Sequence, residues 1–391
     1  MPFDVERARR ETPGVESVLH FNNAGSALMP VGVLDAQIEH LRLEAQIGGY
    51  EAADAARDNV ERVYSAAAQL IGASPDEIAV IENATRAWDM AFYSIPFKRG
   101  DRILTAMAEY ASNFIAYLQV AKTHGAQVEV IPNDEHGQVS IEHLQSMIDD
   151  RVRLIAITHV PTNGGLVNPA AEIGAVAKQA GVLYLIDACQ SVGQLPVSVD
   201  EIGCDMLSTT GRKYLRGPRG TGFLYVRRSV LDQLEPVMLD LHAAQWTSRD
   251  TYTVRDDARR FENWETNYAA KIGLGVAIDY ALDWGMDLVW ERVQELAGQL
   301  RAGLNAISDV TVRDIGSVQG GIVTFTIERR DLTEVKNALA AQAINVTVSR
   351  TPSTRLDMED RGLTQIIRAS VHYYNSEDEV ARFCSAIEAQ A

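Results

Sequence analysis

Short apolar runs alternate with amphipathic stretches between residues 60 and 226. The runs that predict strands are residues 77–81, 102–107, 127–131, 154–158, 182–186, 206–209 and 222–226. Helical patterns lie between most of them, and residues 59–71 place their apolar side chains on one helical face. This alternation predicts an α/β fold whose large domain holds a mostly parallel, seven-stranded sheet with helices on both faces.

The pattern changes after about residue 265, where long helical stretches replace the alternation. The elements predicted there are helices at 266–284 and 288–307, a strand at 320–327, a helix at 332–341, a strand at 367–372 and a helix at 378–389. They predict a small C-terminal α+β domain. We expect the large domain to span residues 15–284, and the small domain to combine residues 1–14 with 285–391.

Composition narrows the class of protein. The chain has 391 residues and a formal net charge of -17, and this acidity argues against binding to nucleic acid or to anionic membranes. No apolar run approaches the roughly 18 residues of a membrane span, and the charged N-terminus does not predict a secretory signal. The three cysteines have neither CxxC spacing nor a nearby histidine pair, so we expect no disulfide, no metal site and a cytoplasmic location.

Two charged residues follow consecutive predicted strands. Asp187 ends the run VLYLID, and Lys213 follows the next strand in the stretch STTGRKYLRGPRGTG. In a parallel sheet, ligands bind at the carboxyl ends of the strands, where these two side chains would meet. Pyridoxal 5'-phosphate requires a lysine for its Schiff base and an acid for its ring nitrogen. The pair therefore predicts this cofactor; the alternatives are a helix cap for Asp187 and a surface position for Lys213.

The segment IENATRAWDMAF offers a place for the phosphate of such a cofactor. A predicted strand leads into Asn83, Ala84 and Thr85, and a helical pattern follows. The start of a helix binds anions through its free backbone N–H groups. Thr210 and Arg212, close to Lys213, would add a hydroxyl group and a positive charge. The alternative is a simple helix cap at Asn83 or Thr85.

Several segments, in order along nearly the whole chain, resemble the class V aminotransferase and cysteine desulfurase family of fold type I enzymes, which use pyridoxal phosphate. The segments that carry the resemblance are FNNAGSALMP at 21–30, NATRA at 83–87, AEYASN at 108–113, HVPTNGGLVNP at 159–169, IDACQSVGQ at 186–194, TTGRKYLRGPRGTGFLY at 209–225, RFENWETN at 260–267 and IIRASVHYYNSEDE at 366–379. The closest likeness is to the C–S lyase and isopenicillin-N-epimerase-like branches.

The resemblance implies a role for each matching residue. Lys213 would form the Schiff base and carry protons, and Asp187 would pair with the ring nitrogen. The other residues that it implies for cofactor binding are Ala84, Thr85, Tyr110, Asn163 (or Thr162 if the alignment shifts by one), Gln190, Thr210, Arg212 and Thr266, the last across a dimer interface. For substrate binding it implies Arg368, as a fork for the substrate carboxylate, together with Asn23 and Trp246.

The chain also departs from the family's pattern. Tyr110 stands where the family has a stacking histidine, and Arg212 replaces the histidine before the lysine. The loop SRTPSTRLDMEDRGLTQI at 349–366 lacks the nucleophilic cysteine of desulfurases. We expect Cys189, Cys204 and Cys384 to be packed and unreactive.

The expected reaction follows from the missing loop cysteine and from the segment EAQIGGYEAADAA at 44–56, which resembles the C–S lyase branch. The leading hypothesis is a lyase that acts on an amino acid through an external aldimine, by β-elimination at a cysteine-derived C–S bond, without a persulfide cysteine. The alternatives are an aminotransferase, an amino-acid epimerase resembling isopenicillin-N epimerase, and a non-catalytic ligand-binding protein of the same fold. The resemblance further implies a homodimer with active sites at the interface. The pattern assigns no role to Arg216 and Arg219.

Overall fold

A computed structural model describes residues 3–391; Met1 and Pro2, which the predicted small domain includes, lie outside the described residues. Its larger sheet has seven strands in the order β2 (Ile78–Ile81), β8 (Gly222–Val226), β7 (Met206–Thr210), β6 (Leu183–Asp187), β5 (Val152–Thr158), β3 (Arg102–Thr105) and β4 (Gln127–Val130). Only β8 runs antiparallel to its neighbours. The predicted fold class, with a mostly parallel seven-stranded sheet, is confirmed.

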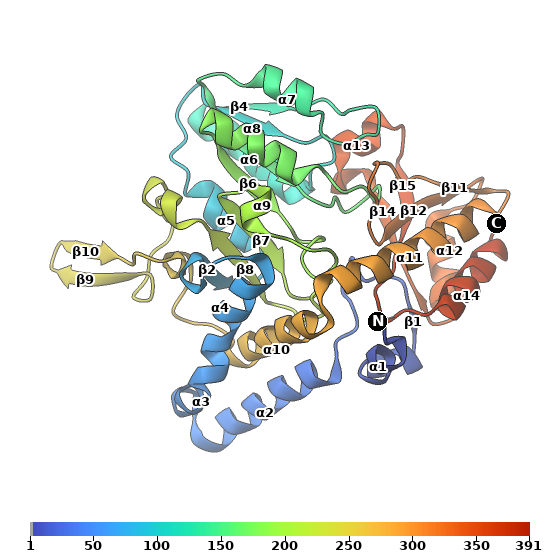
Figure 1. The fold of residues 1–391 in the computed structure, drawn as a ribbon, viewed down its shortest axis with the longest axis horizontal. Coiled ribbons are helices and arrows are strands. Elements are labelled where there is room, and N and C mark those ends of the chain that lie inside the picture. The colour runs from blue at the N-terminus through green and yellow to red at the C-terminus, as the bar shows by residue number, and fades with distance from the viewer. Residues whose placement is uncertain (1–2) are drawn as a thin grey trace.

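Helices cover both faces of this sheet (Figure 1). Successive strand residues point to opposite faces, so Ile155 joins one apolar core while Leu154 joins the other. The first core includes side chains of α4 (Arg57–Ile71), α8 (Ala170–Ala180) and α10 (Tyr268–Trp284), and the second includes side chains of α5 (Ala84–Tyr93) and α6 (Ala111–His124). Two shorter helices of this region are α7 (Ile141–Met147) and α9 (Val199–Ile202).

A second, antiparallel sheet follows in the C-terminal part. Its strand order is β11 (Val310–Val312), β12 (Ile322–Ile327), β15 (Gln365–Ser370) and β14 (Thr347–Arg350). Its helices are α11 (Met286–Asn305), α12 (Leu332–Ala340), α13 (Arg355–Asp360) and α14 (Glu377–Glu388). The apolar pattern predicted only β12 and β15, because β11 and β14 are short and half-buried. The division of the chain at residue 284 stays a prediction.

The N-terminal segment reaches both parts. Helix α1 (Val5–Arg10) contributes Ala8 to the core under the smaller sheet and pairs Arg9 with Glu379 of α14, and β1 (Leu19–His20) pairs with β13 (Ile344–Asn345). Helix α2 (Val31–Ile47) then packs against α10, and α3 (Gly49–Ala55) leads into α4. Short 3-10 helices lie at Pro13–Glu16, Pro75–Glu77, Arg228–Gln233, Ala258–Phe261 and Thr351–Ser353.

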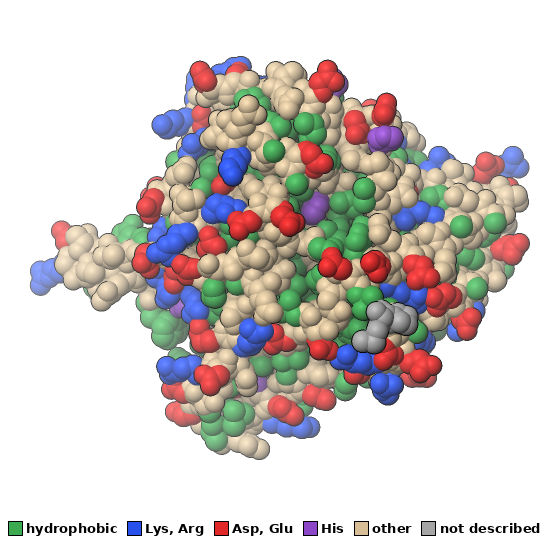
Figure 2. Space-filling view, viewed as in Figure 1, with side chains coloured by type: hydrophobic (Ala, Val, Ile, Leu, Met, Phe, Trp, Pro, Cys, Tyr) green, Lys and Arg blue, Asp and Glu red, His purple; other side chains and the backbone are tan. Residues whose placement is uncertain are grey.

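A hairpin that the sequence pattern did not predict projects from the large sheet's side of the molecule (Figure 1). It consists of β9 (Ala244–Ser248) and β10 (Thr251–Val254), and most of its residues are exposed. Acidic and basic side chains are interspersed over the face shown in Figure 2. No helix within residues 3–391 is both long enough and apolar enough to cross a membrane.

Candidate active site

A cavity of about 250 Å³ lies at the carboxyl ends of the central strands. It contains most of the side chains that the sequence singled out. The residues that line it are Asn83, Ala84, Thr85, Tyr110, Thr158, Thr162, Asp187, Cys189, Gln190, Thr210, Arg212 and Lys213. Eight of the ten residues predicted to bind the cofactor are in this set; Asn163 and Thr266 are the two that are not.

Helix α5 brings its N-terminus to this cavity. Asn83 caps the helix, because its side-chain oxygen accepts a hydrogen bond of 3.0 Å from the backbone N–H of Arg86. Strand β8 passes so close that a Cβ at Gly222 would collide with the carbonyl oxygen of Thr209 and lie only 3.4 Å from the amide nitrogen of Ala84. Glycine at position 222 therefore lets β8 pass close to the N-terminus of α5, where free backbone N–H groups can bind an anion.

Asp187 and Lys213 meet in the cavity as the parallel sheet predicts. Asp187 is the last residue of β6, and Lys213 lies in the turn after β7. The carboxylate of Asp187 accepts a 2.9 Å hydrogen bond from the backbone N–H of Cys189. Burial lowers the pKa of the Lys213 amine, while the charge of Asp187 opposes that shift. A lowered pKa makes the free, nucleophilic amine more accessible near neutral pH.

Some polar groups of the other cavity residues have no hydrogen-bond partner in residues 3–391, and others are already bonded to the protein. The side-chain oxygen of Gln190 is buried without a hydrogen-bond partner in residues 3–391, whereas its nitrogen donates to the carbonyl of Ala24. Arg212 donates to the carbonyl of Gly25, and the Thr210 hydroxyl donates to the carbonyl of Thr221. Tyr110, at the N-cap of α6, is partly exposed at the cavity. An unpaired acceptor, a lysine, an acid and an open helix start together fit pyridoxal phosphate.

Arg368, on strand β15 of the smaller sheet, lies next to this cavity and contacts it through Thr162. Its guanidinium group donates to both the carbonyl and the hydroxyl oxygen of Thr162, which lines the cavity. The side chain is only 8% exposed, its Nε atom has no partner among the described residues, and no carboxylate of those residues pairs with it. Burial lowers its pKa to about 10. A buried guanidinium with free donors is suited to an anion such as a substrate carboxylate.

The structure corrects the choice between Asn163 and Thr162. Asn163 turns away from the cavity and donates hydrogen bonds of 3.0 and 2.8 Å to the hydroxyls of Ser353 and Thr354. Thr162 takes the cavity position instead. Asn163 therefore ties the 349–366 loop to the end of β5, and Thr162 is the residue that contacts Arg368.

Three other predicted residues lie outside the cavity. Trp246 is on the projecting hairpin and is 78% exposed. Thr266 lines two surface hollows, both of which also contain Glu82 and Glu265. Asn23 is buried, and its amide donates to the carbonyl of Ser370 at 2.7 Å. Within one chain, none of the three reaches the Lys213 cavity; a contribution of Thr266 across a dimer interface stays a prediction.

The expectation that all three cysteines are packed is wrong for one of them. Cys204 is fully buried and Cys384 is half-buried, but Cys189 lines the cavity beside Asp187. Burial and the charge of Asp187 raise the pKa of the Cys189 thiol. At neutral pH this group is therefore a thiol and not a thiolate.

Sequence reasoning missed Glu109 and Asn113, which lie directly behind the cavity. Asn113 donates a 3.0 Å hydrogen bond to the carboxylate of Asp187 and a 2.9 Å bond to Glu109. Both residues stand in the stretch AEYASN, where Glu109 precedes the N-cap of α6 and Asn113 lies in the helix's first turn.

Comparison with known proteins agrees with this geometry. The model of the family described as Aminotransferase class-V matches residues 19–383. This architecture defines fold type I enzymes that depend on pyridoxal phosphate. The chain belongs to the class V aminotransferase family, and its cofactor is pyridoxal 5'-phosphate.

Several individual relatives are named cysteine desulfurases or probable cysteine desulfurases. A probable cysteine desulfurase of Methanothermobacter thermautotrophicus is 30% identical, with 98% of this chain and 97% of the relative covered. The structure of a cysteine desulfurase from Thermococcus onnurineus NA1 matches with a TM-score of 0.93 and 27% identity, covering 100% of this chain and 98% of the other. A C-DES mutant with glycine linked to its PLP cofactor has the same fold, with a TM-score of 0.87, 22% identity, and 97% of this chain and 98% of the other covered.

These relatives overturn the leading hypothesis from the sequence. A β-eliminating C–S lyase without a persulfide is wrong as the expected function, because three relatives and a solved structure that cover at least 95% of the chain are named cysteine desulfurases or probable cysteine desulfurases. The hypothesis rested on the absence of a cysteine in the 349–366 loop and on the likeness of EAQIGGYEAADAA at 44–56 to the C–S lyase branch. The loop therefore carries no thiol of its own, but a thiol from elsewhere can still form a persulfide.

Proposed function

We propose that this enzyme removes sulfur from L-cysteine and releases alanine, with a persulfide as the second product. The observation that carries the proposal is the position of Arg368, a buried cation without an acid partner among the described residues, beside the Lys213 cavity. Lys213 and Arg368 together suit an amino acid that is held by its carboxylate next to the cofactor. The activity named for the relatives supports cysteine as that amino acid.

Each cavity residue has a proposed role. When bound, pyridoxal phosphate supplies an electron sink for negative charge at the Cα atom of an amino acid. Lys213 would anchor the cofactor and move the Cα proton, and Asp187 would hold the proton on the ring nitrogen. Ala84, Thr85, Thr210 and Arg212, which line the cavity, would hold the phosphate; Gln190 would hydrogen-bond the phenolic oxygen and Tyr110 would stack on the ring.

The sulfur atom requires a thiol acceptor. Attack of a thiolate on the substrate's Sγ forms an S–S bond, and the Cβ–Sγ bond breaks with its electron pair going to carbon, which takes up a proton. One thiol and one cysteine thus give one persulfide and one alanine, without an oxidant. Cys189 is the cysteine that lines the cavity, but its raised pKa keeps it protonated. We therefore propose that the acceptor is a thiol from outside the chain.

The products test this proposal directly. The holoenzyme is incubated with L-cysteine and an added thiol, and alanine, pyruvate and persulfide are measured. Alanine in equal amount to persulfide supports desulfuration, whereas pyruvate without alanine contradicts it. In Cys189→Ser, we expect alanine formation to persist; its loss with normal cofactor binding would assign the acceptor to Cys189.

Replacing Arg368, the proposed fork for the substrate carboxylate, tests its role in substrate binding separately from any role in the fold. We expect Arg368→Lys to raise the KM for cysteine by roughly 10- to 100-fold, since a charged hydrogen bond contributes about 1.5–3 kcal/mol and lysine cannot form the bidentate pair. Steady-state kinetics checks this, with Arg350→Lys as the control because Arg350 is exposed on the neighbouring strand β14. An unchanged KM in Arg368→Lys would remove Arg368 from the substrate site.

We also propose that the enzyme works as a homodimer in the cytoplasm. The support is the family resemblance, together with aromatic side chains that one chain leaves exposed, among them Trp246 and Tyr50. Light scattering after size-exclusion chromatography measures the mass, and a single-chain mass of 42.9 kDa would contradict the dimer.

A further inference from the structure

A second buried carboxyl group lies behind Asp187. Glu109 is 3% exposed, and no cationic side chain in residues 3–391 forms an ion pair with it. Only neutral groups donate to it: the amide of Asn113, the hydroxyl of Thr105 at 3.1 Å, the hydroxyl of Thr158 at 2.5 Å and the backbone N–H of Tyr110 at 2.9 Å. An ionised carboxylate without a cation is costly to bury, so this site favours the protonated acid.

The amide of Asn113 connects the two carboxyl groups. Its nitrogen carries two hydrogens, and it lies 2.9 Å from an oxygen of Glu109 and 3.0 Å from an oxygen of Asp187. One hydrogen can therefore bind each carboxyl group. The two acids are close enough that ionisation of one disfavours ionisation of the other.

The surroundings decide which acid holds the proton. Asp187 lines the cavity together with Lys213, and its carboxyl group accepts a hydrogen bond from the backbone N–H of Cys189. Glu109 faces Asp187 and the phenol of Tyr117, whose own pKa is raised by burial and by Glu109. Burial, and then the charge of Asp187, raise the pKa of Glu109 to about 7. The proton is thus held on Glu109, the acid that lies farther from the cavity.

We propose that Glu109 is a positioning residue for the cofactor's ring nitrogen, acting through Asn113 and Asp187. The protonated Glu109 fixes the amide of Asn113, and that amide orients the carboxyl group of Asp187, which would accept a hydrogen bond from the ring nitrogen of the bound cofactor. This inference rests on the proposed role of Asp187. It does not depend on which amino acid is the substrate, because it concerns only the resting enzyme.

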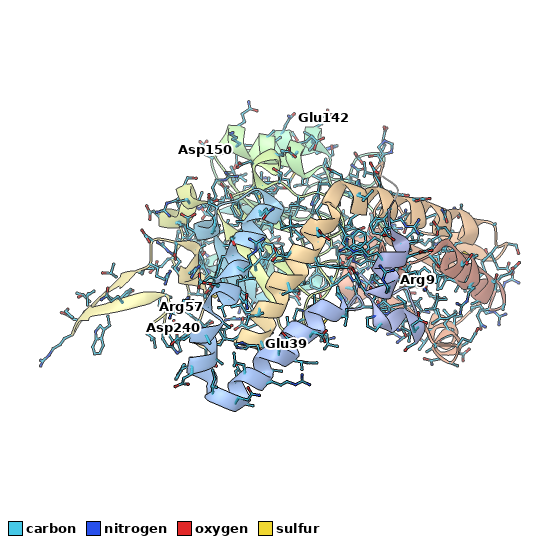
Figure 3. All side chains as sticks on the ribbon, turned by 60° about the horizontal axis from the view of Figure 1, so that its bottom comes forward. Arg9, Glu39, Arg57, Glu142, Asp150 and Asp240 are labelled. Carbon is cyan, nitrogen blue, oxygen red and sulfur yellow. The ribbon has the colours of Figure 1, made fainter. Side chains whose placement is uncertain are left out.

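Infrared spectroscopy of the cofactor-free protein tests where the proton is held. We expect the carbonyl stretch of a protonated carboxyl group in the wild type below about pH 7, its loss above that pH, and its absence in Glu109→Gln. Glu142→Gln is the matched control, because Glu142 is exposed on α7 and its side chain extends to solvent (Figure 3). Retention of the band in Glu109→Gln overturns the assignment.

The absorption of the bound cofactor tests the connection to the ring. We expect the wild-type spectrum to change as the pH passes the titration of Glu109, and this change to be absent in Glu109→Gln and in Asn113→Leu, which lacks the bridging amide. Thr158→Val keeps both carboxyl groups but removes a donor that lowers the pKa of Glu109, so its spectral transition should move to higher pH.

Two results would overturn the proposal: pH profiles of the cofactor spectrum that are identical in the wild type and Glu109→Gln, or a transition in Thr158→Val at the same or lower pH. Thr158→Val retains every charge, so it remains informative if Glu109→Gln does not fold. None of these measurements uses an amino-acid substrate. These measurements would therefore stand even if the enzyme released no alanine from cysteine. Release of alanine from cysteine, in turn, does not depend on their outcome.

Discussion

Lys213→Ala is expected to lose the visible absorption of the bound cofactor and to reduce turnover by at least about 10³-fold. The other cations at the site are Arg212 and Arg368, and a guanidinium group cannot act as an amine nucleophile. The fold should tolerate the change, because burial already lowers the pKa of the Lys213 amine and alanine removes that desolvation cost.

The measurement is an absorption spectrum after incubation with pyridoxal phosphate and removal of the free cofactor, followed by the product assay with cysteine. Lys178→Ala is the control, since Lys178 is exposed at the end of α8. A Lys213→Ala protein that keeps the colour and turnover of the wild type would contradict the assignment of Lys213 as the anchor.

The central sheet was predictable because its apolar runs are long and its helices are amphipathic. Once the parallel order is known, residues at the ends of adjacent strands must lie together. Asp187 at the end of β6 and Lys213 after β7 follow from that rule alone. The cofactor was predicted from this pair and is confirmed by the family.

Residues in loops were less predictable, because local backbone geometry decides which side chain faces the cavity. Thr162 and Asn163 are adjacent, and Gly164 and Gly165 follow with φ values of 81° and 69°. In this sharp turn, one side chain faces Arg368 and the other faces the 349–366 loop. The sequence allows either residue at the cavity, and only the conformation of the turn shows which side chain faces it.

The reaction was mispredicted for a different reason. A missing loop cysteine was interpreted as missing persulfide chemistry, although the motifs specify only where the cofactor and carboxylate bind. The acceptor thiol belongs to a later step. Cys189 illustrates the same limit, because its neighbours Ala188 and Gln190 are buried and the pattern could not show that its own side chain reaches the cavity.

Arg216, which the sequence left without a role, is one of the most buried charged residues of the described chain. It is 1% exposed, and its guanidinium donates to the carbonyl of Leu28 and the hydroxyl of Tyr373, both at 2.8 Å, and to the hydroxyl of Thr12. It also lies 4.5 Å from the ring centre of Tyr374, a cation–π distance. Arg216 thus connects the turn that carries Lys213 to the N-terminal segment and to the chain after β15.

Arg216→Met is expected to lower the free energy of unfolding by roughly 3–5 kcal/mol, because it leaves several buried acceptors unpaired and removes the cation–π contact. Methionine retains much of the side-chain volume, and the positive φ of 58° at this position strains methionine as it does arginine, so the backbone cost does not change. Urea unfolding followed by circular dichroism measures the loss. Arg219→Ala, three residues along and exposed, should change stability by less than about 0.5 kcal/mol. Equal stabilities for the two variants would show that the buried guanidinium does not hold the Lys213 turn in place.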